Sequence, residues 1–259
     1  MKKSSIILMM ALAAFVFEGC KKKSTETVTP TLEVEESSQV LVAKHTWTGC
    51  GQCGGWGFTN FESNIDSYPD EVHVAFKKGN VGPYNNEAIY DHIQAAFDIP
   101  TGTPKFHNNL DATLNIPTAE QNLIDNGVIL NANYEMTFEG DKIKLNTTTK
   151  FFQNTVGKYY LAPFLVVDNI EASQQGHPDT PNTLHKKVVV DIAKPVGEAQ
   201  SNYNGYLIAS GDIKAGHTIN LECEVDRDAA WLAEDVSFAL MMFREKADGS
   251  LEFINVMSK

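Results

Sequence analysis

The chain has 259 residues, of which 42% are hydrophobic and 21% charged, and its formal net charge is −12. This composition is typical of a globular protein and excludes an intrinsically disordered chain, and the length is enough for two domains of ordinary size. The acidic balance argues against nucleic acid or anionic lipid headgroups as the main partner. We therefore expect no nucleic-acid partner.

The first 19 residues are predicted to be a secretion signal. A positively charged start precedes the apolar segment 6–17, which is shorter than the roughly 20 residues that a membrane-spanning helix needs. The segment ends in Gly19-Cys20, which resembles the lipobox of bacterial lipoproteins, although Glu18 is atypical of it. The resemblance implies cleavage before Cys20 and lipidation of this residue. The alternative is plain secretion with a free Cys20, but exposed free thiols are avoided outside the cytoplasm.

Residues 20–37 are predicted to form a flexible tether. The basic run 21–23 would lie at the membrane surface or would simply be solvated. Residues 25–38 are polar and rich in Thr, Glu and Ser, a composition typical of linkers.

The apolar segment 40–43 leads into two cysteines, Cys50 and Cys53, spaced C-x-x-C. A strand that ends before Cys50 would place this cysteine at a helix N-terminus, where unpaired N–H groups and the macrodipole favour an anion. Such a position lowers a cysteine pKa from about 8.5 to roughly 3.5–7.5, and the thiolate is the nucleophile in disulfide exchange. The alternatives are a structural disulfide or half of a zinc site. Zinc needs four ligands, and Cys223 is isolated far away, so a redox pair is favoured.

The order of elements after the cysteines resembles the thioredoxin fold. A helix-length segment is followed by a strand at 71–77, a helix at 86–97 and then Thr103-Pro104. In the thioredoxin family a cis-proline preceded by Thr, Val or Ile packs against the active-site disulfide. The resemblance implies that Cys50 and Cys53 are the catalytic pair and that Thr103 and Pro104 present their backbone to the substrate.

Three positions depart from the thioredoxin pattern. Gly49 and Gln52 stand where that family has Trp and Pro, and Lys44 replaces the buried carboxylate six residues before the first cysteine. A buried, cationic Lys44 would stabilise the thiolate, tune its pKa and favour an oxidant or isomerase. Lys44 could equally point to solvent. These departures argue against a general reductase but not against the redox pair.

The remaining signals of the first half are helical. Phe58, Phe61 and Ile65 recur at helical spacing, and glycines at 54, 55 and 57 weaken the start of that helix by up to about 1 kcal/mol each. Thr118 and Gln121 fit a capping box before a helix that runs to about residue 128.

The second half alternates apolar and polar residues instead. Eight strand-like runs are recognised: 134–138, 143–151, 159–167, 187–192, 206–209, 218–225, 236–244 and 251–256. Many short strands with no helical pattern between them favour an antiparallel sandwich. In the long loop 168–184 and just after it, His177 and His185 could be metal ligands, but we favour ordinary surface histidines and expect no metal. Cys223 is expected to be a small buried hydrophobe.

The predicted fold class is therefore α/β plus all-β. A thioredoxin-like domain at 38–130 is expected before an antiparallel, immunoglobulin-like β-sandwich domain at 131–259. Together with the lipobox, this order resembles a group of Gram-negative outer-membrane lipoproteins named for a twenty-eight-kilodalton outer-membrane protein. The resemblance implies a bacterial cell-envelope location, lipid-anchored to the outer membrane on its periplasmic or its external side.

Three functions follow as hypotheses. The first is an envelope thiol–disulfide oxidoreductase, with Cys50 attacking and Cys53 resolving, envelope proteins as substrates and no cofactor. The second is a non-catalytic binding or adhesion lipoprotein in which Cys50–Cys53 is a permanent structural disulfide. The third is copper handling by Cys50, Cys53 and His45.

Overall fold

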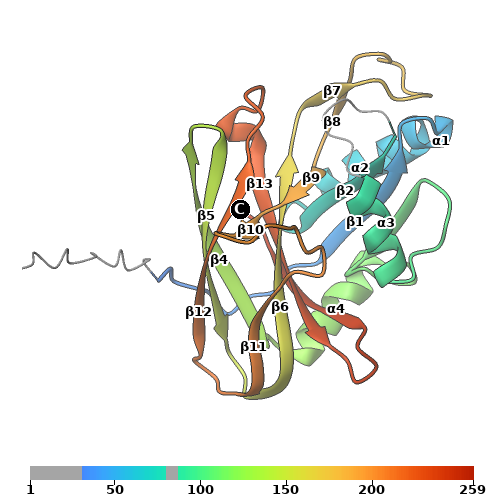
Figure 1. Ribbon diagram of the computed structural model, residues 1–259. Coiled ribbons are helices and arrows are strands. Elements are labelled where there is room, and N and C mark those ends of the chain that lie inside the picture. Colours follow the sequence, from blue (N-terminus) through green and yellow to red (C-terminus); the bar gives the residue numbers. More distant parts are fainter. Residues whose placement is uncertain (1–30, 80–86) are drawn as a thin grey trace, which may run out of the picture.

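The computed structural model describes residues 31–79 and 87–259, and Figure 1 shows how they are arranged. Strands hold 45% of these residues and helices 18%. The described part of the chain is therefore mostly β.

The α-helices of the described residues all come from the first half of the chain. The elements there are β1 (Leu41–Trp47), α1 (Gly51–Gly54), α2 (Trp56–Ser67), β2 (Val72–Lys78), α3 (Glu87–Ala96), β3 (Lys105–Asn108) and α4 (Ile116–Asn126). The single helix expected after the cysteines is two helices, because Gly55 has a non-helical conformation (φ −85°, ψ −117°) between α1 and α2. The predicted capping box is also wrong: Asn115 caps α4, and its Oδ1 accepts a hydrogen bond from Thr118 N at 2.9 Å.

The second half supplies most of the strands. They are β4 (Leu130–Glu139), β5 (Lys142–Phe151), β6 (Thr155–Val167), β7 (Ile170–Ala172), β8 (Thr183–His185), β9 (Val188–Ile192), β10 (Lys194–Pro195), β11 (Tyr206–Ile213), β12 (Thr218–Asp226), β13 (Val236–Glu245) and β14 (Leu251–Met257). A short 3-10 helix, η2 (Ala233–Asp235), precedes β13. The strand-like runs of the sequence thus correspond to strands.

Strands from both halves join in one large sheet. Its order is β14-β13-β6-β9-β2-β1-β3, with β11 also paired to β6. A second sheet has the order β10-β12-β5-β4, and β7 and β8 form a separate hairpin. The join lies at β9, which runs parallel to β2 (Ala75↔Val188) and antiparallel to β6 (Val167↔Val188).

This topology corrects the predicted fold class. A thioredoxin-like α/β domain with a sheet of its own is not what the structure has, because β1, β2 and β3 continue through β9 into the β-rich half. Strand β9 can join the two halves because the apolar side chains of Val188–Val190 are all buried, as is typical of a strand covered on both faces. The sandwich part of the prediction does fit, although one of its sheets is shared. The predicted boundary between two domains, at residues 130 and 131, stays a prediction.

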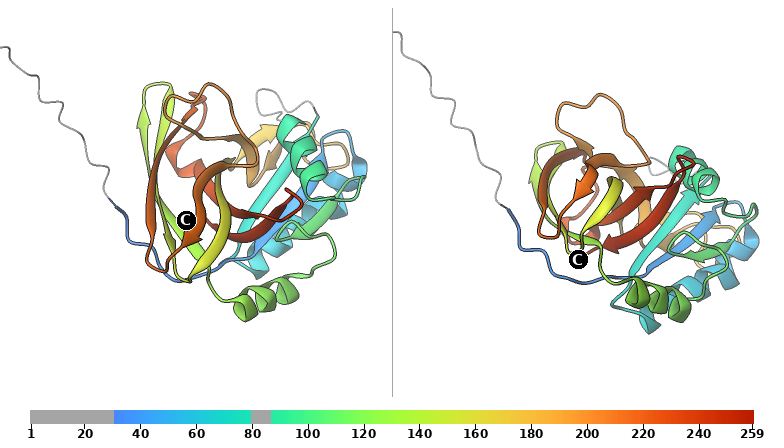
Figure 2. Two further views of the ribbon diagram at one scale, coloured as in Figure 1. Left: turned by 60° about the horizontal axis from the view of Figure 1, so that its bottom comes forward. Right: turned by 90° about the horizontal axis from the view of Figure 1, so that it is seen from below.

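The two sheets pack face to face at one end of the molecule, and the helices gather at the other, as Figure 2 shows. The core between the sheets includes Leu145, Tyr159, Leu165 and Phe238. On the other face of the large sheet, Ile89 and Ile93 of α3 pack in a second core. Strand β1 is covered on both sides, because Leu41 packs in the core that contains α3 and Val42 packs against α4.

Residues 31–37 lie along the second sheet. Asn133 Nδ2 donates to Glu33 O at 2.7 Å, and Asn131 Nδ2 donates to Glu35 O at 3.1 Å. Val34 is buried. The part of the predicted tether that the structure describes is thus hydrogen-bonded to strand β4, whereas residues 20–30, with Cys20, lie outside the described residues.

Candidate functional site

Cys50 and Cys53 form a disulfide at the end of the large sheet. Cys50 is the N-cap of α1, and its Sγ accepts a hydrogen bond from Cys53 N at 3.1 Å. Cys53 is fully buried, whereas Cys50 is partly exposed. Of the two cysteines, Cys50 is therefore the one that is accessible at the surface.

The segment Thr103-Pro104 lies directly against this disulfide. Its peptide bond is cis, and Cys50 Sγ lies 3.4 Å from the carbonyl oxygen of Thr103. Gly57 makes the close packing on α2 feasible, since a Cβ at this position would lie 2.6 Å from Cγ of Pro104. Thr103 and Pro104 are thus next to the cysteines, as the sequence predicts, and their role toward a substrate stays a prediction.

The loop of the β7–β8 hairpin packs on the turn that holds the cysteines (Figure 1). The side-chain amide of Gln174 lies 3.2 Å from the carbonyl oxygens of both Trp47 and Cys50 and 3.3 Å from that of Thr48. A Cβ on Gly54 would lie 2.2 Å from the carbonyl oxygen of Gln175. The hairpin therefore supports the cysteine turn from residues more than a hundred positions downstream, as the 124 positions between Gln174 and Cys50 indicate.

Lys44 is buried, with 4% of its surface exposed, so it does not point to solvent. Its ammonium nitrogen lies 5.3 Å and 5.1 Å from the ring centres of Phe58 and Phe61 on α2. Burial lowers the pKa of Lys44 to about 8, and the nearby Glu62 opposes this shift. Its influence on the cysteines stays a prediction.

A second buried lysine, Lys77 on β2, was not recognised from the sequence. Its Nζ lies 3.4 Å from Gln174 Oε1 and also contacts the ring nitrogens of His185. Burial lowers the pKa of Lys77 to about 6, with repulsion from Lys44 as the second cause. Burial, followed by the charge of Lys77, lowers the pKa of His185 to about 3.

The histidines do not join the cysteines in a metal site. His45 Nδ1 lies 2.6 Å from Nε2 of the buried His107, and the His45 ring packs edge-on to Tyr90. The ring of His177 lies 4.3 Å from that of Phe58. Within residues 31–79 and 87–259, no group of three or more His, Cys, Asp or Glu side chains could hold a metal ion. The copper hypothesis therefore has no support from the described residues.

Cys223 is buried in the core between the sheets, as expected. Burial raises the pKa of its thiol to about 12, so it is inert as a nucleophile.

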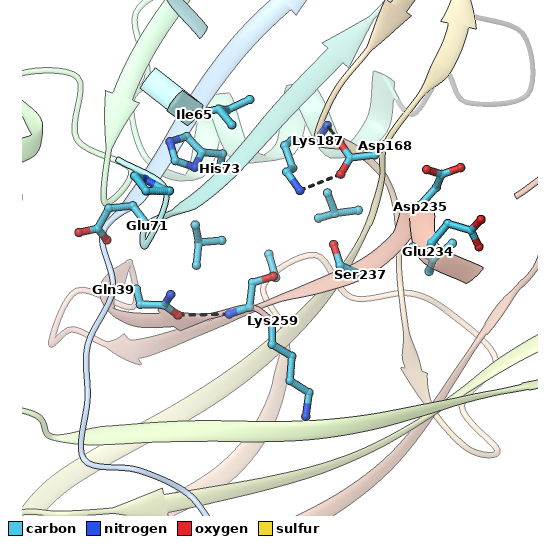
Figure 3. A pocket seen from close by; sticks show the side chains of 16 residues that line it. Gln39, Ile65, Glu71, His73, Asp168, Lys187, Glu234, Asp235, Ser237 and Lys259 are labelled. Carbon is cyan, nitrogen blue, oxygen red and sulfur yellow. Dashed lines mark hydrogen bonds and ion pairs between the residues drawn. The ribbon is translucent and has the colours of Figure 1, made fainter. Parts of the chain in front are cut away.

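A separate cleft of about 370 Å³ lies between the start of β2 and the start of β13. Figure 3 shows the side chains that line it. Its charged side chains include Asp168 and Lys187, which form an ion pair at 2.7 Å. Glu71 accepts a hydrogen bond from Val40 N. The charges that line this cleft are thus largely satisfied within the protein, and we assign it no chemistry.

No family model matches the chain, and no curated protein matches it. Solved structures with a similar fold include the following two. HBP35 of Porphyromonas gingivalis superposes with a TM-score of 0.67 at 16% identity, over 88% of this chain and 76% of that one. A crystal structure of a protein from Agrobacterium tumefaciens has a TM-score of 0.50 at 10% identity, over 87% of this chain and 95% of that one. At these identities the similarity concerns the fold alone.

Proposed function

We propose that the protein catalyses thiol–disulfide exchange on polypeptides in the bacterial cell envelope. The observation that carries this proposal is the asymmetry of the pair: Cys50 is partly exposed beside the Thr103 carbonyl, whereas Cys53 is buried in α1. Exchange needs one sulfur that a substrate can reach and a second that can resolve the mixed disulfide. The disulfide offers both.

The reaction proceeds through Cys50. In the reduced protein the Cys50 thiolate attacks a substrate disulfide, forms a mixed disulfide and expels one substrate thiolate. Cys53 loses its proton, attacks the Cys50 sulfur and expels the second substrate thiolate, so that the Cys50–Cys53 disulfide forms. The reverse sequence oxidises a substrate dithiol. The hydrogen bond from Cys53 N to Cys50 Sγ would stabilise the Cys50 thiolate.

Two aromatic side chains near the cysteines favour a polypeptide substrate. Trp47 ends β1 and Trp56 begins α2, and they are 44% and 49% exposed. Exposed indoles provide apolar area with a polar edge, which suits a flexible polypeptide segment around a substrate cysteine.

The location is proposed from the leader. Cys20 would carry lipid in the outer membrane, in line with the resemblance to the group of outer-membrane lipoproteins given above. No helix among the described residues has the length and apolar character of a membrane span. Mass spectrometry of the native N-terminus should find a lipidated Cys20; an unmodified Cys20 would remove the anchor.

The second candidate, a non-catalytic binding or adhesion lipoprotein, is favoured by one observation. The β7–β8 loop packs so tightly on Gly54 that a permanent Cys50–Cys53 disulfide would brace this contact. In this case the disulfide is structural, and its reduction potential should lie below about −300 mV.

Trapping separates the two candidates. A Cys53→Ser variant exposed to envelope proteins cannot resolve its mixed disulfides, so covalent complexes through Cys50 should accumulate. Cys50→Ser, which keeps the buried sulfur, is the matched control and should trap nothing. Absence of complexes with both variants, together with a potential below about −300 mV, would favour the structural disulfide.

A further inference from the structure

The side-chain amine of Lys77 is buried, and hydrogen-bond acceptors surround it. Gln174 Oε1 is an acceptor at 3.4 Å. Both ring nitrogens of His185 contact Lys77 Nζ, and Nε2 also lies 3.3 Å from Ala172 O. With the ring proton on Nε2, directed at Ala172 O, Nδ1 is the nitrogen that accepts from Lys77. The surroundings can therefore hold an N–H donor in either its amine or its ammonium form.

Among the described residues, no fixed anion balances a charge on Lys77. The lining of a small cavity includes Lys44 from β1, Glu62 from α2, Lys77 from β2 and Lys186 from the segment before β9. Glu62, the acidic side chain among the described residues of this lining, pairs with the exposed Lys186 at 2.9 Å. Besides these, His185 and His177 are the titratable groups that face the lysine cluster, and both carry no negative charge. An ammonium on Lys77 thus lacks a buried counter-ion while the cysteines form a disulfide.

Gln174 connects this amine to the redox pair. Its Oε1 faces Lys77, and its Nε2 lies 3.2 Å from the carbonyl oxygen of Cys50. The amine is therefore one side chain away from the backbone of the cysteine that would become a thiolate. Reduction would place a thiolate on Cys50, the residue whose backbone carbonyl Gln174 contacts.

We propose that Lys77 is a redox-linked proton site, which takes up a proton when the Cys50–Cys53 disulfide is reduced and releases it when the disulfide re-forms. This inference rests on the proposed function. With a dithiol as the reductant, the S–S bond breaks, the dithiol closes to its own disulfide, and its two electrons pass to the protein sulfurs. Of its two protons, one goes to the Cys53 thiol and one to Lys77, which leaves Cys50 as a thiolate.

This proton balance predicts that the wild type and Lys77→Arg differ in the pH dependence of disulfide reduction. A purely structural lysine would not produce this difference. Because the wild-type reaction exchanges no proton with solution, its equilibrium constant against dithiothreitol should be nearly independent of pH between 7 and 8. In Lys77→Arg the charge is permanent, so reduction releases one proton, and the constant should rise about tenfold over this pH unit. Lys77 is a positioning residue here, since it touches neither sulfur.

A second readout uses thiolate absorbance at 240 nm in the reduced full-length protein. Lys77→Met removes the positive charge and should reduce the Cys50 thiolate fraction about tenfold at a given pH, whereas Lys77→Arg should preserve it. Lys186→Met removes an exposed lysine from the same cavity and should leave the thiolate titration unchanged.

The outcomes separate this inference from the proposed function. Identical pH dependence of wild type and Lys77→Arg, or a wild-type thiolate titration in Lys77→Met, would overturn the proton site even if mixed disulfides are trapped. A disulfide that no dithiol reduces would overturn both.

Discussion

Replacement of Gly54 by alanine should separate the β7–β8 hairpin from the cysteine turn. The added methyl would lie 2.2 Å from the carbonyl oxygen of Gln175 and 2.7 Å from the backbone nitrogen of His177. Both are backbone atoms, so no side-chain rotation relieves the overlap, and the loop must move. Overpacking of this kind costs about 1–3 kcal/mol. The displaced loop would also lose hydrogen bonds between Gln174 and the carbonyl of Cys50.

Gly51→Ala is the matched control. It lies on the same short helix α1, but a Cβ there would meet nothing within 4 Å. This variant should be neutral or up to about 1 kcal/mol more stable, because alanine favours helix over glycine. Urea unfolding of the oxidised proteins measures the free energies, and hydrogen exchange of residues 173–178 reports the loop. Equal stability of the two variants, with unchanged exchange, would refute the packing argument.

Two further predictions concern the core. Tyr134→Phe should lower the free energy of unfolding by about 1–3 kcal/mol. The Tyr134 hydroxyl accepts a hydrogen bond from the buried Phe238 N–H at 3.2 Å, and this donor would lose its partner. An unchanged midpoint of urea unfolding would contradict this prediction. Burial lowers the pKa of His45 from 6.5 to about 4, so in that interval the unfolded chain binds more protons and stability falls as the pH falls. In His45→Leu the free energy of unfolding should fall less between pH 6.5 and 4 than in the wild type, by on the order of 3 kcal/mol, as measured by urea unfolding at both pH values. An equal loss of stability in the variant would show that His45 does not cause the dependence.

The sequence predicts the local features of the site well. A strand before Cys50, the cysteine at a helix start and the approach of Thr103-Pro104 all depend on residues close in the chain or on their order. The sequence does not predict Gln174 or Lys77 as neighbours of the site. These two residues contact each other across 97 positions, and neither belongs to a motif.

Lys44 illustrates a second limit. Alternation of apolar and polar residues indicates which face of a strand is buried only when the other face meets water. Strand β1 is covered on both faces, so Lys44 and its neighbour His45 are both buried although they point in opposite directions. The same holds for β9: its apolar run predicts a strand, but not the sheet that it joins.

The position of β9 also has a consequence for the order of folding. Strand β2 obtains its outer neighbour from a segment that is made more than a hundred residues later, as the pairing of Ala75 with Val188 shows. Until β9 arrives, β2 presents an open edge of unpaired backbone groups, which is a template for incorrect pairing. Closure of so long a loop is slow compared with local pairing. A chain that is still emerging from a ribosome or a translocon would therefore need protection of this edge, and truncation before residue 188 should yield an aggregating product rather than a stable N-terminal fragment.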